Sequence, residues 1–225
     1  EMQRPARYGP LIDELRERGM GHEQAYLDHL VAQGLSVETI SAGLDVGKST
    51  LDLTLDAMRS GVDLIYQAAL AGDLWSGRAD FLRKVSRESD LGEWSYEVID
   101  TKLSRETRGG TILQLCVYAH LLERLQGVRP ETVYVVSPGT NFLEISYRTD
   151  DYAAYFRLLA GNIQGFLADQ PGTYPEKVSQ CDFCVWWDQC EKRRRSDDHL
   201  CYVAGIASSQ ITELRTLGVD TLESL

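Results

Sequence analysis

Apolar positions along the chain predict alternating helices and strands around a mixed sheet. Helical spacing of apolar residues predicts helices over residues 9–33, 49–59, 112–125 and 150–167. Short apolar or alternating runs predict strands over residues 36–40, 74–85, 94–102, 132–136 and 143–147, with a further short apolar element over 62–71. Gly19 and Gly21 predict a break or kink in the first helix, just before His22. The order of elements predicts an α/β or α+β fold.

Proline and glycine divide the chain into three regions. Pro171, Gly172 and Pro175 predict a boundary after the last long helix. We therefore expect a core domain over 1–175, a cysteine-rich segment over 176–203 and a third element over 204–225. The chain opens Glu1-Met2-Gln3-Arg4-Pro5 and stops at Leu225 in mid-pattern, so we expect it to be a piece of a longer polypeptide.

Composition narrows the class of protein without identifying it. With 225 residues, 43% hydrophobic and 25% charged, the chain has the composition of a globular domain, which excludes disordered, collagen-like and disulfide-scaffold proteins. No apolar run is long enough for a membrane span, so we expect no membrane partner. The formal net charge of −11 argues against passive coating of nucleic acid, although basic residues gather over 78–108 and 192–195 and leave room for a local basic groove.

Two aspartates and a lysine form the first candidate site. Side chains alternate along a strand, so Asp100 and Lys102 share one face of the predicted strand 94–102. If this strand pairs with 74–85 as a hairpin, Asp80 approaches Asp100. Two convergent carboxylates suit Mg²⁺ or Mn²⁺, and the lysine could orient a water or stabilise charge on a phosphate. The alternative is a pair of strand-end acids with Lys102 as an ion-pair partner.

The helix over 112–125 carries a polar pair on an otherwise apolar sequence. Gln114 and Tyr118 are four residues apart and share one face. The pair requires a partner, which is either a buried backbone group or a ligand. Cys116 points elsewhere, and we expect it in the core.

The order of these motifs resembles the RecB-like branch of the PD-(D/E)XK nuclease superfamily. That branch has a Gly-x-x-x-His motif, then Gly-x-x-Asp, then Asp/Glu-x-Lys, then Gln-x-x-x-Tyr. This chain has His22, Gly77-Arg78-Ala79-Asp80, Asp100-Thr101-Lys102 and Gln114-Leu115-Cys116-Val117-Tyr118 in the same order, over about residues 15 to 200. The first motif departs from the pattern, because Arg18 stands where the family has glycine.

The resemblance implies a fold and a role for each residue. It implies a restriction-endonuclease-like mixed sheet flanked by helices. Asp80 and Asp100 would hold Mg²⁺ or Mn²⁺, and His22 and the backbone carbonyl of Thr101 would complete the metal shell. Lys102 would act in catalysis together with the two aspartates. Gln114 and Tyr118 would position DNA or support the metal ligands.

Four of the five cysteines cluster near the C-terminal end, at positions 181, 184, 190 and 201. Clustering with a Cys-x-x-Cys pair predicts metal binding in a reducing compartment, so we expect a cytoplasmic protein. The iron–sulfur nucleases that the chain resembles carry three cysteines at the spacing of Cys181, Cys184 and Cys190 and a fourth upstream of the histidine motif. The resemblance therefore implies a [4Fe–4S] cluster, with its fourth ligand upstream of Glu1 or, failing that, Cys201. Zn²⁺ is the alternative metal.

Two other sequence features suggest different chemistry. Residues 42–49 nearly satisfy the phosphate-binding loop of an ATPase, with Ala42 at the first glycine position and Gly47-Lys48-Ser49 at the end. Residues 204–225 resemble half of a helix-hairpin-helix DNA-binding element, whose alternative is an ordinary connector.

The sequence therefore predicts a metal-dependent DNA nuclease, acting on single strands or DNA ends in repair, recombination or defence. The competing hypotheses are a non-catalytic DNA-binding module of a larger repair machine and, less favoured, an ATPase. The expected partners are DNA and either further domains of the same chain or a helicase.

Overall fold

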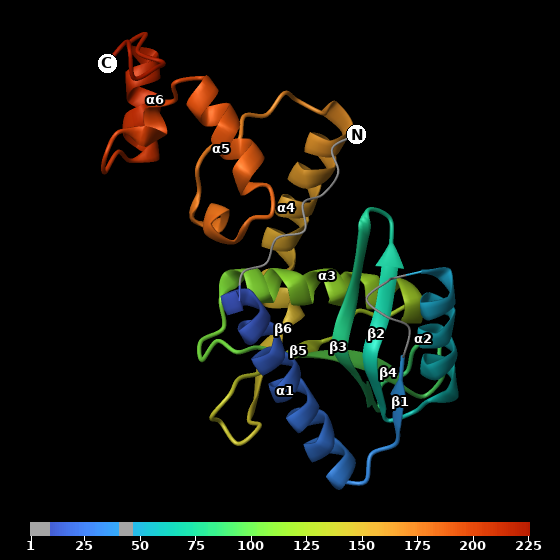
Figure 1. The fold of residues 1–225 in the computed structure, drawn as a ribbon. Coiled ribbons are helices and arrows are strands. Elements are labelled where there is room, and N and C mark those ends of the chain that lie inside the picture. The colour runs from blue at the N-terminus through green and yellow to red at the C-terminus, as the bar shows by residue number, and fades with distance from the viewer. Residues whose placement is uncertain (1–9, 41–46) are drawn as a thin grey trace. The chain divides into compact units, whose positions relative to one another are not determined.

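The computed structural model describes residues 10–40 and 47–225, which form two compact units. One unit comprises the described residues of 15–170, and the other contains residues 171–225 together with residues 10–14. Figure 1 shows the elements of both. Within the described ranges, no helix has both the length and the apolarity that a membrane crossing requires.

The larger unit is built on a mixed sheet, as the sequence predicts, and the sheet has six strands because the apolar element over 62–71 is also a strand. The strands are β1 (Val37–Thr39), β2 (Leu64–Gly72), β3 (Trp75–Val85), β4 (Ser95–Thr101), β5 (Thr132–Val136) and β6 (Glu144–Arg148). They lie in chain order across the sheet. The pairs β1–β2 and β4–β5 are parallel, whereas β2–β3, β3–β4 and β5–β6 are antiparallel. The predicted hairpin between the strands of Asp80 and Asp100 is thus confirmed.

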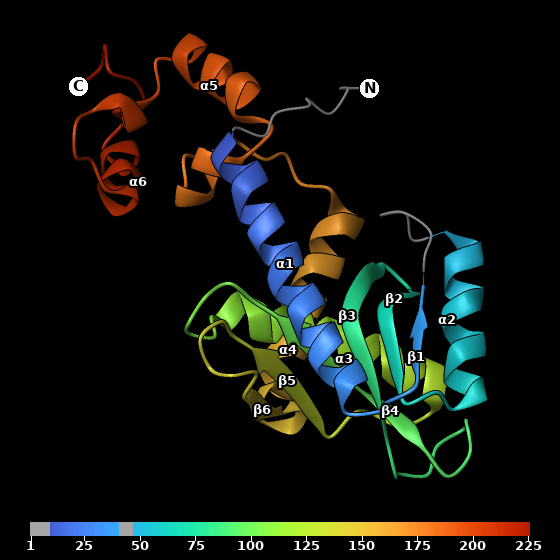
Figure 2. The same cartoon turned by 60° about the horizontal axis from the view of Figure 1, so that its bottom comes forward.

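Helices cover both faces of the sheet. Helix α1 (Pro10–Ala32) packs on one face through Tyr26, Leu27 and Leu30, and Figure 2 shows it crossing that face. Helices α2 (Lys48–Ser60) and α3 (Gly109–Gln126) pack on the other face, and α4 (Thr149–Asp169) packs against α3. Cys116 is 6% exposed in the contact between α3 and α4, which confirms its expected place in the core.

Helix α1 does not break where the sequence predicts a kink. It continues through Gly19 and Gly21 as one helix. A glycine inside a helix costs about 1 kcal/mol relative to alanine. Burial of Tyr26, Leu27 and Leu30 against the sheet holds the C-terminal half of α1 and compensates for that cost.

The β2–β3 ladder is interrupted beside Asp80. Tyr66 pairs with Phe81 and Ala68 pairs with Ala79, but Gln67 and Asp80 between them do not pair. Ile65 and Ala68 on β2 are three residues apart yet face the same core, and so do Ala79 and Leu82 on β3. Strand side chains alternate with period two, so residues three apart would ordinarily face opposite sides. Each strand therefore holds one extra residue at this point. Gln67 adopts the left-handed conformation, with φ of 58°.

The smaller unit consists of short helices joined by polar contacts. These are η1 (Ser179–Phe183), α5 (Trp187–Ser196), η2 (Leu200–Tyr202) and α6 (Ser208–Thr216). Glu176 accepts a bond from Arg215 at 2.8 Å and lies 3.3 Å from His199. Arg194 is fully buried and donates to the carbonyl of Pro175 at 2.8 Å. These contacts tie the segment that enters the unit to its helices.

A close contact between β3 and α3 requires glycine at position 77. A Cβ atom there would lie 2.6 Å from Cε1 of Tyr118, far inside van der Waals contact. The Tyr118 ring is buried, so it has little room to move away. The first glycine of the Gly-x-x-Asp motif is therefore explained by packing.

Gly77→Ala is expected to destabilise the protein by about 1–3 kcal/mol, because the added methyl group overpacks the contact with Tyr118. Chemical denaturation measures the free energy of unfolding. Gly161→Ala is the matched control, since Gly161 lies in α4 with open space around it and alanine there should stabilise by about 0.5–1 kcal/mol. Equal stability of Gly77→Ala and wild type would contradict the packing explanation.

Candidate active site

Asp100 and Lys102 lie together at the C-terminal end of β4. The Asp100 side chain is 1% exposed, and its Oδ2 forms an ion pair with Nζ of Lys102, which is 29% exposed. The two residues share a face, as strand alternation predicts. The amide of Lys102 also donates to the carbonyl of Val136 at 3.0 Å, which fixes the end of β4 against β5.

Asp80 is held by Thr101 across the hairpin. Its Oδ2 accepts bonds from both the backbone amide and the hydroxyl of Thr101, each at 2.8 Å. The interruption of the β2–β3 ladder releases Asp80 from strand pairing, and its carboxylate reaches β4 instead. The resemblance implies a metal-ligand role for the Thr101 carbonyl, whereas its amide and hydroxyl serve here to orient Asp80.

The electrostatics of the pair oppose full ionisation. Burial raises the pKa of Asp100 to about 7, and the nearby charge of Asp80 adds to the effect, while Lys102 opposes it. Burial likewise raises the pKa of Asp80, and the bonds from Thr101 and the charge of Lys102 lower it. Two carboxylates that repel each other in a buried place form a site that a cation would stabilise.

Asp100 has an unused ligand atom. Its Oδ1 is buried and has no hydrogen-bond partner among the described residues. An unpartnered buried carboxylate oxygen is unfavourable unless something binds it. A hard oxygen donor of this kind fits Mg²⁺ or Mn²⁺, which commonly bind one or two carboxylates and complete their shells with water.

His22 reaches the same end of the sheet from α1. Its Nε2 lies 3.1 Å from the carbonyl oxygen of Val136, the oxygen that also accepts the Lys102 amide. A carbonyl only accepts, so Nε2 is the donor, and the tautomer that donates through Nε2 has its lone pair on Nδ1. Metal-binding histidines commonly donate their other ring nitrogen to a carbonyl in this way. The ring stacks on Phe142 at 6.2 Å between centroids.

Glu23 belongs to the same charge cluster, and the sequence did not single it out. Burial raises the pKa of Glu23, and the charge of Asp80 raises it further. Gln67 donates a short hydrogen bond to its Oε1. The only signal in the sequence is its place beside His22. We refer to Glu23, Asp80, Asp100 and Lys102 as the charge cluster.

Gln114 and Tyr118 find their partner in the backbone. Gln114 Nε2 donates to the Tyr118 hydroxyl at 2.9 Å, and that hydroxyl donates to the carbonyl of Arg78 at 2.9 Å. Of the two alternatives that the sequence left open, the buried backbone is the one observed. The pair therefore supports the strand that carries Asp80.

The residues do not converge into a complete metal cage. Across residues 10–40 and 47–225, no three His, Cys, Asp or Glu side chains are grouped closely enough to hold a metal ion. The two aspartates and Thr101 are brought together, and His22 is attached to the same strand ends through the Val136 carbonyl.

The clustered cysteines all lie in the smaller unit and are free and half-buried. Cys181 is in η1, Cys184 follows it, Cys190 is in α5 and Cys201 is in η2. The amide of Val178 lies 3.4 Å from Sγ of Cys181 and donates to it. Cys201 lines a hollow of about 420 Å³ with Val178 and Asp182, so it faces the segment of Cys181.

Three arginines of the basic run 192–195 have acidic partners within their own unit. Arg193 pairs with Asp197 at 2.6 Å, and Arg195 pairs with Glu191 at 2.8 Å. Arg194 is buried. Lys192, Arg193 and Arg195 are nevertheless exposed, whereas Arg194 is withdrawn from the surface.

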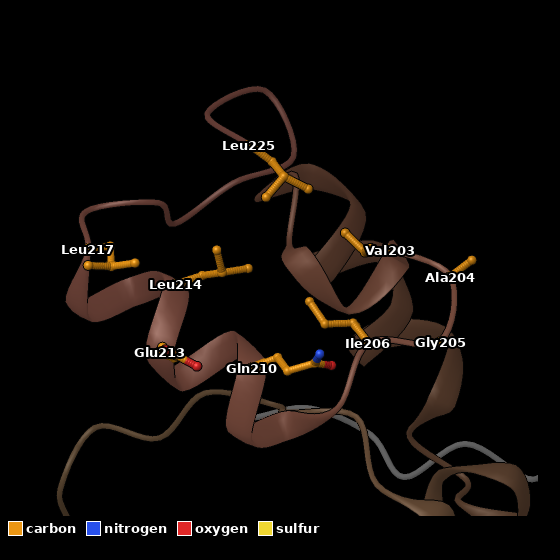
Figure 3. Close-up of a pocket in the computed structure, with 9 residues that line it drawn as sticks. All are labelled: Val203, Ala204, Gly205, Ile206, Gln210, Glu213, Leu214, Leu217 and Leu225. Carbon is orange, nitrogen blue, oxygen red and sulfur yellow. The ribbon is translucent and has the colours of Figure 1, made fainter.

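A second hollow in the smaller unit is mainly apolar (Figure 3). It has a volume of about 420 Å³ and is lined by nine residues: Val203, Ala204, Gly205, Ile206, Gln210, Glu213, Leu214, Leu217 and Leu225. It contains no cysteine or histidine, so it offers no ligand set for a metal. Within 204–225, a turn at Gly205 with φ of 74° leads into α6.

The loop that resembles an ATPase phosphate-binding loop falls mainly on residues 41–46, outside the described residues. Of that motif, the structure describes Gly47 as the N-cap of α2 and Lys48 as its first residue.

Comparison with known proteins adds no family. No protein-family model matches the chain, and a search of curated proteins finds no match.

The pKa of Asp100 predicts a pH-dependent stability for the metal-free protein. The unfolded chain ionises Asp100 near its ordinary pKa of 3.8, whereas the folded protein does so at about 7. The free energy of unfolding should therefore fall as pH rises from about 4 to 7 and then level off. Asp100→Asn should reduce this slope, leaving the part that comes from Asp80 and Glu23, and should be more stable than wild type at pH 8 in EDTA by on the order of 2 kcal/mol. Denaturant titrations across this range test it.

Asp63→Asn is the control, and its effect on stability at pH 8 should have the opposite sign to that of Asp100→Asn. Hydrogen bonds from the Ser36 side chain and amide lower the pKa of Asp63. Its stabilisation is present above the ordinary carboxylate pKa and is lost in acid, so Asp63→Asn should destabilise the protein at pH 8. An Asp100→Asn protein that is less stable than wild type at pH 8 would contradict the proposed repulsion.

Proposed function

We propose that the chain is a metal-dependent DNA nuclease whose active site is the charge cluster. The observation that carries the proposal is the buried Oδ1 of Asp100, which has no partner in the part of the chain that the structure describes and lies beside a second carboxylate and a lysine. A mixed sheet flanked by helices is consistent with a restriction-endonuclease-like fold. The order of the four motifs supports the same assignment.

The chemistry assigned to the residues is phosphodiester hydrolysis. Asp80 and Asp100 would hold Mg²⁺ or Mn²⁺, with the Nδ1 of His22 and the carbonyl of Thr101 as further ligands. The ion, when bound, would neutralise charge on the phosphate and lower the pKa of a bound water. Thr101 orients Asp80, and Lys102 offers an ammonium group to the attacking water or to the phosphate oxygens. Tyr118 fixes the strand that carries Asp80.

The surroundings of Lys102 suit a polyanionic substrate. Arg105 and Arg108 are exposed in the loop that follows Lys102. Helix α3 starts directly after Arg108 with two glycines and has no acidic residue in its first turn. Helix N-termini attract phosphate groups through free amides and the helix dipole. A local basic region of this kind accommodates DNA on a chain with an overall acidic charge.

The cysteines support a second cofactor in the smaller unit. We propose that Cys181, Cys184 and Cys190 bind a [4Fe–4S] cluster, with a fourth ligand upstream of Glu1 or from Cys201, and Zn²⁺ as the alternative. Free thiols suit a reducing cytoplasm. Further domains of a longer chain or a helicase are the expected protein partners.

Asp100→Ala and Lys102→Ala should each abolish cleavage of labelled single-stranded DNA with Mn²⁺, because each removes a group of the charge cluster. Asp80→Asn should also weaken Mn²⁺ binding. We expect a loss of about 10³-fold or more in rate. Circular dichroism checks that each variant is folded, and EDTA should stop the wild-type reaction.

Lys48→Ala is the matched lysine control. It should cleave at the wild-type rate, and the protein should not bind ATP. Wild-type cleavage by both Asp100→Ala and Lys102→Ala would disprove the site. DNA binding without cleavage would favour a non-catalytic module, whereas ATP binding that depends on Lys48 would favour the ATPase.

Anaerobically purified protein, with any residues that precede Glu1 included, should contain iron and acid-labile sulfide. Cys181→Ser, Cys184→Ser and Cys190→Ser should each lose the iron, because each removes a cluster ligand. Cys116→Ser is the control and should retain it, since Cys116 lies in the α3–α4 core. Iron loss in Cys201→Ser would identify Cys201 as the fourth ligand. Zinc in the purified protein, with no sulfide, would show that the cysteines bind a zinc ion and not an iron–sulfur cluster.

A further inference from the structure

Ser137 carries a buried hydroxyl group that nothing in the described residues satisfies. The residue is 1% exposed, and its Oγ has no hydrogen-bond partner. Its carbonyl, in contrast, accepts the Thr140 hydroxyl at 2.8 Å, which fixes the turn after β5. Serine hydroxyls can rotate to find partners, so an unpartnered one in a well-fixed backbone indicates a missing partner.

The parallel ladder places Ser137 beside Lys102. Thr101 pairs with Val136, and the Lys102 amide donates to the Val136 carbonyl, so the next pair along the two strands is Lys102 with Ser137. Neighbouring strands are about 4.8 Å apart. Ser137 is thus adjacent to the lysine of the charge cluster.

The side-chain pattern puts Ser137 on the face of Asp100 and Lys102. On β5, Val133 and Val135 belong to the core beneath α3, while Val136 belongs to the core beneath α1. On β4, Val98 belongs to the α3 core and Ile99 to the α1 core. Alternation therefore assigns Asp100, Lys102 and Ser137 to one face.

Two unsatisfied groups therefore lie on neighbouring strands and on one face. Oδ1 of Asp100 can only accept from a donor when ionised, and the Ser137 hydroxyl can donate or accept. They are not bonded to each other. A water molecule satisfies both groups, because it donates to the carboxylate and accepts from, or donates to, the hydroxyl.

We propose that Ser137 is a positioning residue of the active site, whose hydroxyl holds a water that bridges to Oδ1 of Asp100 next to Lys102. The importance of this water for cleavage rests on the proposed function. With Ser137 in place, Asp100, Lys102 and Ser137 surround one water on three sides.

Kinetics and stability distinguish this role from a structural one. Ser137→Ala should lower kcat about tenfold with KM for DNA changed by less than about twofold, because the water loses one of its partners. The same variant should unfold close to the wild-type temperature in EDTA, since the hydroxyl bonds to a water and to no protein group among the described residues. Ser137→Thr keeps the hydroxyl and should recover most of the lost kcat.

Thr54→Val is the matched control. The Thr54 hydroxyl is buried but fully bonded, donating to the Thr50 carbonyl at 2.9 Å and accepting from the Ala69 amide at 3.0 Å. Its loss should lower the unfolding temperature and leave kcat unchanged.

A high-resolution crystal structure tests the water independently of cleavage. We expect an ordered water within hydrogen-bond distance of both Ser137 Oγ and Asp100 Oδ1. A dry site, wild-type kcat in Ser137→Ala, or a loss of stability in Ser137→Ala like that of Thr54→Val would each overturn the proposal. If the wild-type protein does not cleave DNA, the proposed function fails, and the crystal structure still decides whether Ser137 holds the water.

Discussion

Desolvation of neighbouring carboxylates, together with the repulsion between them, is the constraint on which the candidate site depends. Glu23, Asp80 and Asp100 approach one another around the single ammonium group of Lys102. Burial raises the pKa of all three carboxyl groups, and the charge of Asp80 raises the pKa of Glu23 and of Asp100 further, while Lys102 opposes these effects. This arrangement therefore lowers the free energy of unfolding of the metal-free protein, and a bound divalent cation would raise it again.

The scaffold maintains this arrangement from several directions. Thr101 holds Asp80 with two hydrogen bonds. The Tyr118 hydroxyl donates to the carbonyl of Arg78, which lies two residues before Asp80 on β3. The Val136 carbonyl fixes both His22 and the backbone of Lys102. Each of these bonds comes from a different element, so no single element can shift the carboxylates on its own.

Period-two alternation and helical spacing predicted much of this structure. They gave the order of elements, the hairpin that carries both aspartates, the shared face of Asp100 and Lys102, and the pairing of Gln114 with Tyr118. These features depend on local periodicity, which a single sequence displays directly. The helix through Gly19 and Gly21 was mispredicted, because burial of residues further along α1 outweighs the local cost of glycine.

Features that depend on two distant segments were not predictable from local pattern. The ladder interruption needs an extra residue in both β2 and β3, and neither Gln67 nor Asp80 is unusual in its own segment. The buried side chain of Gln126 bonds to both the amide and the carbonyl of Tyr96, as the backbone of a neighbouring strand would. The carboxylate of Glu97 likewise accepts a bond from the amide of Thr132. Such side chains look like surface residues until the fold supplies the backbone groups that they satisfy.

The bond between His22 and Val136 also determines when the site can form. It joins residues 114 positions apart, and the same carbonyl receives the amide of Lys102. Contacts of such long sequence separation carry a large loop-closure cost and are made late in folding. During synthesis, α1 can pack on Leu64, Phe81 and Ile99 of β2, β3 and β4 before β5 emerges, but the bond that fixes His22 forms only once Val136 is available. A chain interrupted before β5 carries Asp80, Asp100 and Lys102 without the strand that brings them into register with His22.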